Sequence, residues 1–252
     1  SCFSDRGLIY QVISSAKNEI GEVQLLGITC LQKYSYLSLP KQVTNNGYTY
    51  SLTKLCQDSL VLCGANVIVV PDTVTEMDSY VFDEQIELLF LSKNCKVIPT
   101  GMITGEGGDT NLRFVSVPEG VTTFAENAFS ANANNTASII LPSTIQTLGK
   151  KALYSFKLVT FLNKKPISNI ATAFKTGTTV KVKKSSISSY KSVLNSKVNV
   201  IAAKNITKAT KLSVNASSVT LSTLATKTLT GTLSKGSNEN IYWSSTDRKS
   251  VV

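Results

Sequence analysis

Three prolines in this chain are each followed by the same spacing of apolar residues. Each proline ends a short apolar run, and apolar residues then stand three, six, ten and eleven positions further on. These are Val74, Met77, Val81 and Phe82 after Pro71, Val121, Phe124, Ala128 and Phe129 after Pro118, and Ile145, Leu148, Ala152 and Leu153 after Pro142. A fixed pattern that recurs along the chain predicts a solenoid, in which each coil buries its apolar face only against its neighbours.

Less regular copies of the pattern extend the array to six expected coils. An early copy begins at Leu39 and Pro40, and residues 45–47 interrupt it. The longer steps contain polar or glycine-rich stretches, 104–111 and 131–136, which we expect to form surface loops. The same offsets give Cys95, Ile98, Met102 and Ile103 from Ser92, and Pro166, Asn169, Ala173 and Phe174 from Asn163.

A run rich in β-branched and aromatic residues precedes each anchor from Pro71 to Asn163. These runs, 67–70, 88–91, 114–117, 138–141 and 159–162, predict short strands that stack into one parallel sheet. Because side chains alternate along a strand, residues one and three before each anchor share one face. We expect this face to be the core: Ile68, Val70, Leu89, Leu91, Val115, Val117, Ile139, Leu141, Thr160 and Leu162.

The repeat is similar to the BspA-like leucine-rich repeat, and residues 112–129 carry the resemblance best. Here Leu112, Val115, Val117, Pro118, Val121, Phe124, Ala128 and Phe129 follow the family's form. Segments 7–10, 22–23 and 48–52 resemble the family's lead-in, and 180–183 with 189–191 resemble its closing unit. The resemblance covers residues 5–203. It implies a right-handed solenoid on a bacterial or protist cell surface, associated with adhesion or host contact and without a shared enzyme activity.

The composition changes after Ala203 to Thr, Ser, Lys and Asn with alternating apolar residues. Together with Trp243 in a Trp-Ser-Ser context, this part resembles the start of a bacterial immunoglobulin-like domain of group 2. Such a sandwich needs roughly 100 residues, so we expect this one to be partial. The alternative is a disordered Ser/Thr/Lys tail. The expected domains are a lead-in cap at 1–36, the solenoid at 37–203 and a partial Ig-like spacer at 204–252.

Composition agrees with a secreted protein. The chain has no apolar run long enough to span a membrane, and it begins without an export signal, which we expect to have been removed. The five cysteines show no metal-ligand spacing. We expect Cys95 to be a core residue, whereas a disulfide between Cys56 and Cys63 stays open.

Charge is distributed unevenly along the chain. Residues 1–149 hold 8 Lys/Arg and 14 Asp/Glu, whereas residues 150–252 hold 18 and 2. The alternative function is that of a structural envelope component, which is anchored to or associates with an anionic wall polymer through the basic half. The charge could also serve solubility alone. Nucleic acid is disfavoured, since arginine is scarce and no recognition motif is present. The lysines with which a polyanion would make contact are Lys181, Lys183 and Lys184.

The residue inventory disfavours an enzyme. The chain has no histidine, so no Ser/His/Asp or Cys/His arrangement can form. Carboxylates cluster between Asp72 and Glu87, but in a solenoid they belong to solvated loops. We expect no catalytic residue, cofactor or metal.

The outward sheet positions are the candidate binding site, because they are apolar where the family has small polar residues. An exposed apolar stripe with aromatic members marks a contact surface for a protein or glycan ligand. The alternatives are that loops cover it or that strand propensity alone explains it. The expected ligand-binding residues are Val67, Val69, Leu88, Phe90, Phe114, Ile140, Val159 and Phe161.

Overall fold

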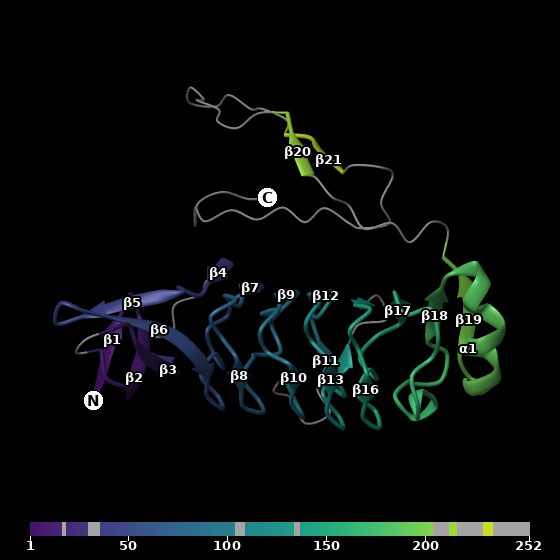
Figure 1. Cartoon of the computed structure of the whole chain (residues 1–252), viewed down its shortest axis with the longest axis horizontal. Coiled ribbons are helices and arrows are strands. Elements are labelled where there is room, and N and C mark those ends of the chain that lie inside the picture. Colours follow the sequence, from purple (N-terminus) through teal and green to yellow (C-terminus); the bar gives the residue numbers. More distant parts are fainter. Residues whose placement is uncertain are drawn as a thin grey trace.

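Residues 36–203 form a row of coils that runs from left to right in Figure 1, with an N-terminal sheet at one end and a short helix at the other. The computed structural model describes residues 1–16, 19–29, 36–103, 109–133, 137–203, 212–215 and 229–233. Among these residues, strands dominate and helix is confined to short segments near the end of the solenoid. This confirms the predicted leucine-rich-repeat solenoid.

One parallel sheet of eight strands runs the length of the solenoid. Its spatial order is β19-β18-β17-β15-β12-β9-β7-β4, so each coil adds one strand next to the previous one. The strands are β4 (Tyr36–Ser38), β7 (Val67–Val69), β9 (Leu88–Phe90), β12 (Phe114–Ser116), β15 (Ser138–Leu141), β17 (Leu158–Phe161), β18 (Thr179–Val182) and β19 (Asn199–Ala202). Four of the five expected strands therefore begin where the sequence placed them.

A second wall carries two-residue strands that the repeat pattern did not predict. These are β8 (Glu76–Met77), β10 (Val97–Ile98), β13 (Thr123–Phe124) and β16 (Thr147–Leu148). β10, β13 and β16 form a parallel sheet, whereas β8 pairs with β6 (Tyr48–Leu55), a strand of the N-terminal cap. The two expected surface loops also pair with each other, through β11 (Asp109–Thr110) and β14 (Asn132–Ala133).

The N-terminal cap is built on a sheet that β8 joins to the second wall of the solenoid. It contains β1 (Cys2–Asp5), β2 (Leu8–Ser14), β3 (Gly21–Ile28), β5 (Gln42–Asn45) and β6 (Tyr48–Leu55). β5 and β6 form the hairpin that the interruption at residues 45–47 produces, and Asn46 and Gly47 both take positive φ in its turn. Asn-Gly is the favoured pair for such a two-residue turn.

The C-terminal end is closed by the short helix α1 (Ile187–Val193), which follows the 3-10 segment η2 (Lys184–Ser186). Tyr190 of α1 is fully buried, and its hydroxyl lies 3.3 Å from the carbonyl oxygens of Asn163 and Lys165. Its ring packs 5.3 Å from that of Phe161, which lies 6.2 Å from Phe174. Burial raises the pKa of the Tyr190 hydroxyl. This aromatic cluster covers the apolar end of the last coils.

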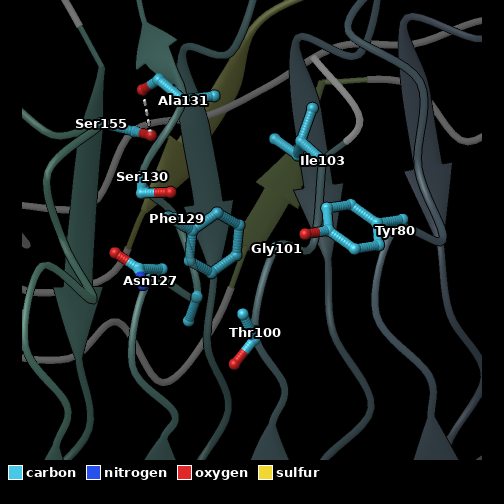
Figure 2. A pocket seen from close by; sticks show the side chains of 10 residues that line it. Tyr80, Thr100, Gly101, Ile103, Asn127, Phe129, Ser130, Ala131 and Ser155 are labelled. Atoms are coloured by element: carbon cyan, nitrogen blue, oxygen red, sulfur yellow. Dashed lines mark hydrogen bonds between the residues drawn. The ribbon is translucent and has the colours of Figure 1, made fainter. Parts of the chain in front are cut away.

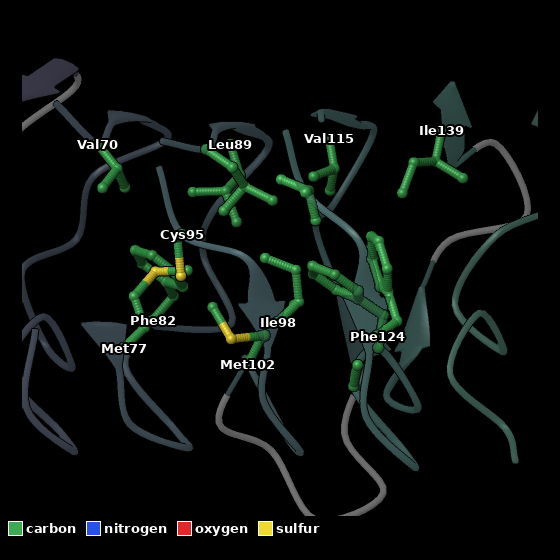
Figure 3. Close-up of a cluster of buried hydrophobic side chains, with 14 of the residues drawn as sticks. Val70, Met77, Phe82, Leu89, Cys95, Ile98, Met102, Val115, Phe124 and Ile139 are labelled. Carbon is green, nitrogen blue, oxygen red and sulfur yellow. The ribbon is translucent and has the colours of Figure 1, made fainter. Parts of the chain in front are cut away.

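The predicted core positions form one continuous hydrophobic interior. Val70, Leu89, Val115 and Ile139 point inward from the large sheet toward Met77, Ile98 and Phe124 of the second wall (Figure 3). Cys95 lies among them and is 1% exposed, as expected. The coil anchored at Asn163 is the exception. Pro166 is half-buried and Asn169 is exposed, and the buried residue there is Ile170 of the 3-10 segment η1 (Ile170–Thr172).

Side chains also join one coil to the next through the carbonyl three residues after an anchor. Ser92 Oγ donates to the carbonyl oxygen of Val74 at 2.6 Å. Thr144 Oγ1 donates to that of Val121 at 2.7 Å, and Asn163 Nδ2 to that of Ile145 at 3.2 Å. These bonds satisfy inner carbonyls that would otherwise be buried without a partner.

A column of left-handed residues runs along the corner after the second wall. Tyr80, Gly101, Asn127 and Lys151 stand nine positions after their anchors, with φ of 57°, 61°, 57° and 57°. The amide of Tyr80 donates to the carbonyl of Gly101 at 2.7 Å, and that of Gly101 to Asn127 at 3.1 Å. Glycine and asparagine suit this conformation, whereas tyrosine and lysine take it only where the stacking imposes it.

The predicted Ig-like region lies mostly outside the described residues. Within it, β20 (Leu212–Val214) pairs antiparallel with β21 (Gly231–Leu233). This pair alone does not test the domain, so the Ig-like assignment and the boundaries at 36 and 203 stay predictions. No helix in the described part of the chain is long and apolar enough to cross a membrane.

Candidate binding surface

The outward-pointing side chains of β7, β9, β12, β15 and β17 form a surface that we call the outer face. Strand register aligns them in two rows across the sheet, because each strand pairs in parallel with the next without a shift. One row is Val67, Leu88, Phe114, Ser138 and Leu158, and the other is Val69, Phe90, Ser116, Ile140 and Thr160. Seven of these ten residues are apolar.

The apolar part of the outer face is contiguous and partly open to solvent. Val67, Val69, Phe90, Phe114 and Ile140 are all half-buried and lie on four adjacent strands. Close neighbours on a sheet shield one another, which explains why none of them is fully exposed. The five residues keep the outward orientation that the sequence predicted.

Leu88 also points outward, but it is only 7% exposed. It is not a member of the hydrophobic core cluster, so its burial comes from the outer side of the sheet. Val67 and Phe114 flank it directly on the neighbouring strands. Leu88 therefore packs beneath its neighbours on the outer face, and it offers little exposed area for contact with a ligand.

The prediction that Val159 and Phe161 belong to this surface is wrong. Both are fully buried, and Val159 aligns with the core residue Ile139. The strand before Asn163 is offset by one position, since Leu162 corresponds to Pro142 in register and Asn163 does not. Thr160 and Leu162, predicted as core, are consequently only half-buried. Leu158 takes the outward place instead.

Beyond β17 the same face becomes polar and basic. Thr160 aligns with Lys181 of β18, and Leu158 aligns with Thr179. Asn199 of β19 continues the row beside Thr179. The contiguous apolar part of the outer face thus ends at β17, although Ile201 of β19 aligns with Lys181 on the same face.

Five lysines gather at the carboxyl ends of the neighbouring strands β17 and β18, and we call them the lysine edge. The register of the two strands places both chain exits at the same edge of the sheet. Residues 150–203 contain eleven lysines and no Asp or Glu, so no carboxylate within this stretch offsets their charge. Lys181 and Lys183 are half-buried, and the others are exposed. The lysine edge is Lys164, Lys165, Lys181, Lys183 and Lys184.

Three of the carboxylates between Asp72 and Glu87 make contacts between coils or within a turn. Asp72 lies 3.1 Å from Lys93 Nζ and accepts the Lys93 amide at 3.2 Å, and this bond lowers its pKa. Glu87 pairs with Arg113 at 3.3 Å. Asp83 accepts the amides of Leu62 and Gln85. Each of these three carboxylates thus binds a group of a neighbouring coil or turn.

The cysteines among the described residues are free thiols. Cys56 and Cys63 form no disulfide, and Cys2 and Cys95 are also unpaired with another cysteine. Burial raises the pKa of the Cys63 thiol and raises that of Cys95 to about 11. These two thiols are therefore structural rather than reactive.

The stacked coils, the inter-coil bonds and the single sheet define a leucine-rich-repeat solenoid with an apolar outer face. The family model of the BspA type leucine rich repeat region, with six copies, matches residues 30–136 and 106–220. Because these matches together span most of the chain, the protein belongs to the BspA-type leucine-rich repeat family. No curated protein matches the chain.

Three bacterial proteins are among the solved structures to which the chain is similar. A leucine rich cell surface protein of Faecalibacterium prausnitzii is 15% identical, with 74% of this chain and 72% of that chain covered and a TM-score of 0.33. The pneumococcal vaccine antigen PcpA is 13% identical, with 73% and 65% covered and a TM-score of 0.39. A leucine-rich repeat protein of Bacteroides ovatus is 15% identical, with 79% and 67% covered and a TM-score of 0.34. These values are too low to transfer a property from any of them.

Proposed function

We propose that this protein is a non-enzymatic binding protein of the cell surface, and that its outer face binds a protein ligand. The observation that carries the proposal is the contiguous group of half-buried apolar side chains around Phe90 and Phe114. Contiguous apolar surface with aromatic members is typical of interaction sites. The family's usual small polar residues at these places would not provide it.

The chemistry of the outer face favours a protein over a glycan. Its central strands carry Val69, Phe90, Phe114 and Ile140, and none of its ten positions holds a charged or amide side chain. A glycan needs several donors and acceptors, whereas an apolar side chain of a protein gains by burial here. Ser116 and Ser138 supply hydroxyls between the apolar residues for a few hydrogen bonds.

An array of extracellular and cell-surface proteins, probed with the labelled full chain, tests the proposal. We expect the chain to bind at least one arrayed protein, and the double substitution Phe90→Ser/Phe114→Ser to abolish this binding. Val97→Ser is the matched control, because Val97 is 50% exposed on β10 and lies off the outer face. Loss of binding in the control, or no bound protein on the array, would contradict the proposal.

A second function, attachment to an anionic wall polymer, has its own supporting observation in the lysine edge. Clustered lysines bind polyanions with counterion release, so that affinity falls steeply with salt. The test is binding to immobilised teichoic acid and heparin at rising salt, for the chain and for Lys181→Gln/Lys183→Gln/Lys184→Gln. Binding that salt does not change would exclude this function.

A further inference from the structure

A pocket of about 250 Å³ opens at the corner that the left-handed column follows (Figure 2). Its walls come from consecutive coils, with Tyr80 on one side, Gly101 in the middle and Asn127 on the other. Phe129, which is 1% exposed, lies at its base. None of the residues of the outer face lines it, so this is a separate feature of the molecule.

The pocket lies where turn residues of consecutive coils stack. Gly101 lets the Tyr80 ring lie directly against its backbone, where a β-carbon would clash with the ring. On the far side, Ser155 Oγ donates to the carbonyl oxygen of Ala131 at 2.6 Å, which fixes that rim. Both rims and the base thus belong to the rigid repeat scaffold rather than to a free chain end.

An aromatic ring forms one wall. Tyr80 is 41% exposed, and its ring lies against the α-carbon of Gly101. Hydrogen bonding of the left-handed column holds the Tyr80 backbone in place. The face of such a ring carries partial negative charge and attracts C–H groups of a ligand.

The remaining wall carries neutral hydrogen-bonding groups. Thr100 and Ser130 are exposed and Asn127 is half-buried. Among the residues that the structure describes, none of these three side chains is engaged in a hydrogen bond. Together they provide hydroxyl and amide groups that both donate and accept. No side chain that lines the pocket carries a charge at neutral pH.

We propose that this pocket binds one ring of a neutral saccharide. A sugar ring has a less polar C–H face that suits the Tyr80 ring and hydroxyls that suit Asn127, Thr100 and Ser130. A charged ligand would be desolvated here without an opposite charge, and a purely apolar one would leave the amide of Asn127 unpaired. Pockets of this kind combine apolar walls with a few placed polar groups.

The test is a titration of the isotope-labelled full chain with D-glucose, D-galactose, D-mannose and N-acetyl-D-glucosamine, followed by NMR. We expect at least one sugar to shift the side-chain amide of Asn127 and the backbone amide of Gly101, with a saturable Kd in the range of about 1–10 mM. D-Glucosamine and D-glucuronate should bind more weakly than the neutral sugars, because the pocket offers no counter-charge.

Two substitutions remove side chains that we propose to contact the sugar, and both replacements fit the positive φ of the backbone at these positions. Tyr80→Asn and Asn127→Gly both introduce residues that tolerate positive φ. Each should weaken the binding by about tenfold or more. Tyr48→Asn is the control, because Tyr48 is equally exposed, at 46%, but lies in the cap strand β6. Thermal unfolding shows whether each variant is folded.

Three results would overturn the proposal: no saturable shift with any neutral sugar, shifts only outside the pocket, or undiminished binding by both folded variants. The test of sugar binding by the pocket can fail or succeed independently of the test of protein binding by the outer face. Phe90→Ser/Phe114→Ser leaves the pocket intact and should not change the sugar titration. Tyr80→Asn should likewise leave protein binding unchanged.

Discussion

The ring of Tyr80 lies against Gly101 of the next coil so closely that a β-carbon there would be 2.6 Å from Tyr80 Cε1. Gly101 also has φ of 61°, where side chains are disfavoured. We therefore expect Gly101→Ala to lower the free energy of unfolding by about 1–3 kcal/mol. Chemical denaturation measures this change.

Gly27→Ala is the matched control for this substitution, since no atom lies within 4 Å of a β-carbon at Gly27. It should change stability by less than about 0.5 kcal/mol. In a Tyr80→Asn background, Gly101→Ala should cost less, because the ring is gone and only the backbone strain remains. An equal cost in both backgrounds would show that the ring contact contributes nothing.

Substitution by serine should lower the free energy of unfolding much more at Phe161 than at Phe90. Phe161 is fully buried beside Phe174 and Tyr190, so Phe161→Ser should cost about 3–5 kcal/mol in unfolding free energy. Phe90 is half-buried on the outer face, and Phe90→Ser should cost within about 1 kcal/mol. Similar losses in both variants would mean that the outer face is part of the core.

Thiol labelling should follow burial. Cys2 is exposed and should react with a maleimide in the native protein, whereas Cys63 and Cys95 should react only after unfolding. Burial raises the pKa of both buried thiols, so the reactive thiolate is scarce near neutral pH. Peptide mass spectrometry with and without guanidinium measures this. Rapid native labelling of Cys95 would contradict the packing described for it.

The Asp72–Lys93 pair should make a small contribution to the free energy of unfolding, and this contribution should depend on pH. The folded pKa of Asp72 lies below its usual value, mainly because it accepts the Lys93 amide. The resulting stability is present above the unfolded pKa and is lost as pH falls through the folded value. Because both side chains are about half exposed, Asp72→Asn should cost at most about 1 kcal/mol at pH 7, and less in high salt.

Unfolding of the wild type and of Asp72→Asn at pH 7 and at acid pH checks this. The two stabilities should converge as the carboxyl becomes protonated. A difference that stays constant with pH would show that the carboxylate charge has no part in it.

The sequence predicted the coils well because proline and apolar spacing both mark the same corner. Pro71, Pro118 and Pro142 fix where a strand ends, and the residues before them alternate correctly. The register failed at Asn163, which replaces the proline, although it held at Ser92, where proline is also absent. Val159, Phe161 and Leu162 are all hydrophobic, so hydrophobicity alone cannot select a face, and the distant Tyr190 decides it by packing on Phe161.

The saccharide pocket had only a weak signal in the sequence. Its walls come from turn positions that carry no apolar pattern, and they meet because successive coils stack. Gly101 and Asn127 at the same offset are residues that favour positive φ, which points to a left-handed turn. Nothing local indicates that Tyr80 lies across Gly101.

Protein binding through the outer face is tested most directly by comparing two variants on the same protein array. One is Phe90→Ser/Phe114→Ser, and the other is Lys181→Gln/Lys183→Gln/Lys184→Gln. We predict that the first loses the binding shown by the wild type, whereas the second retains it at both low and high salt. Binding that survives the first variant and disappears with the second, or with salt, would contradict the account.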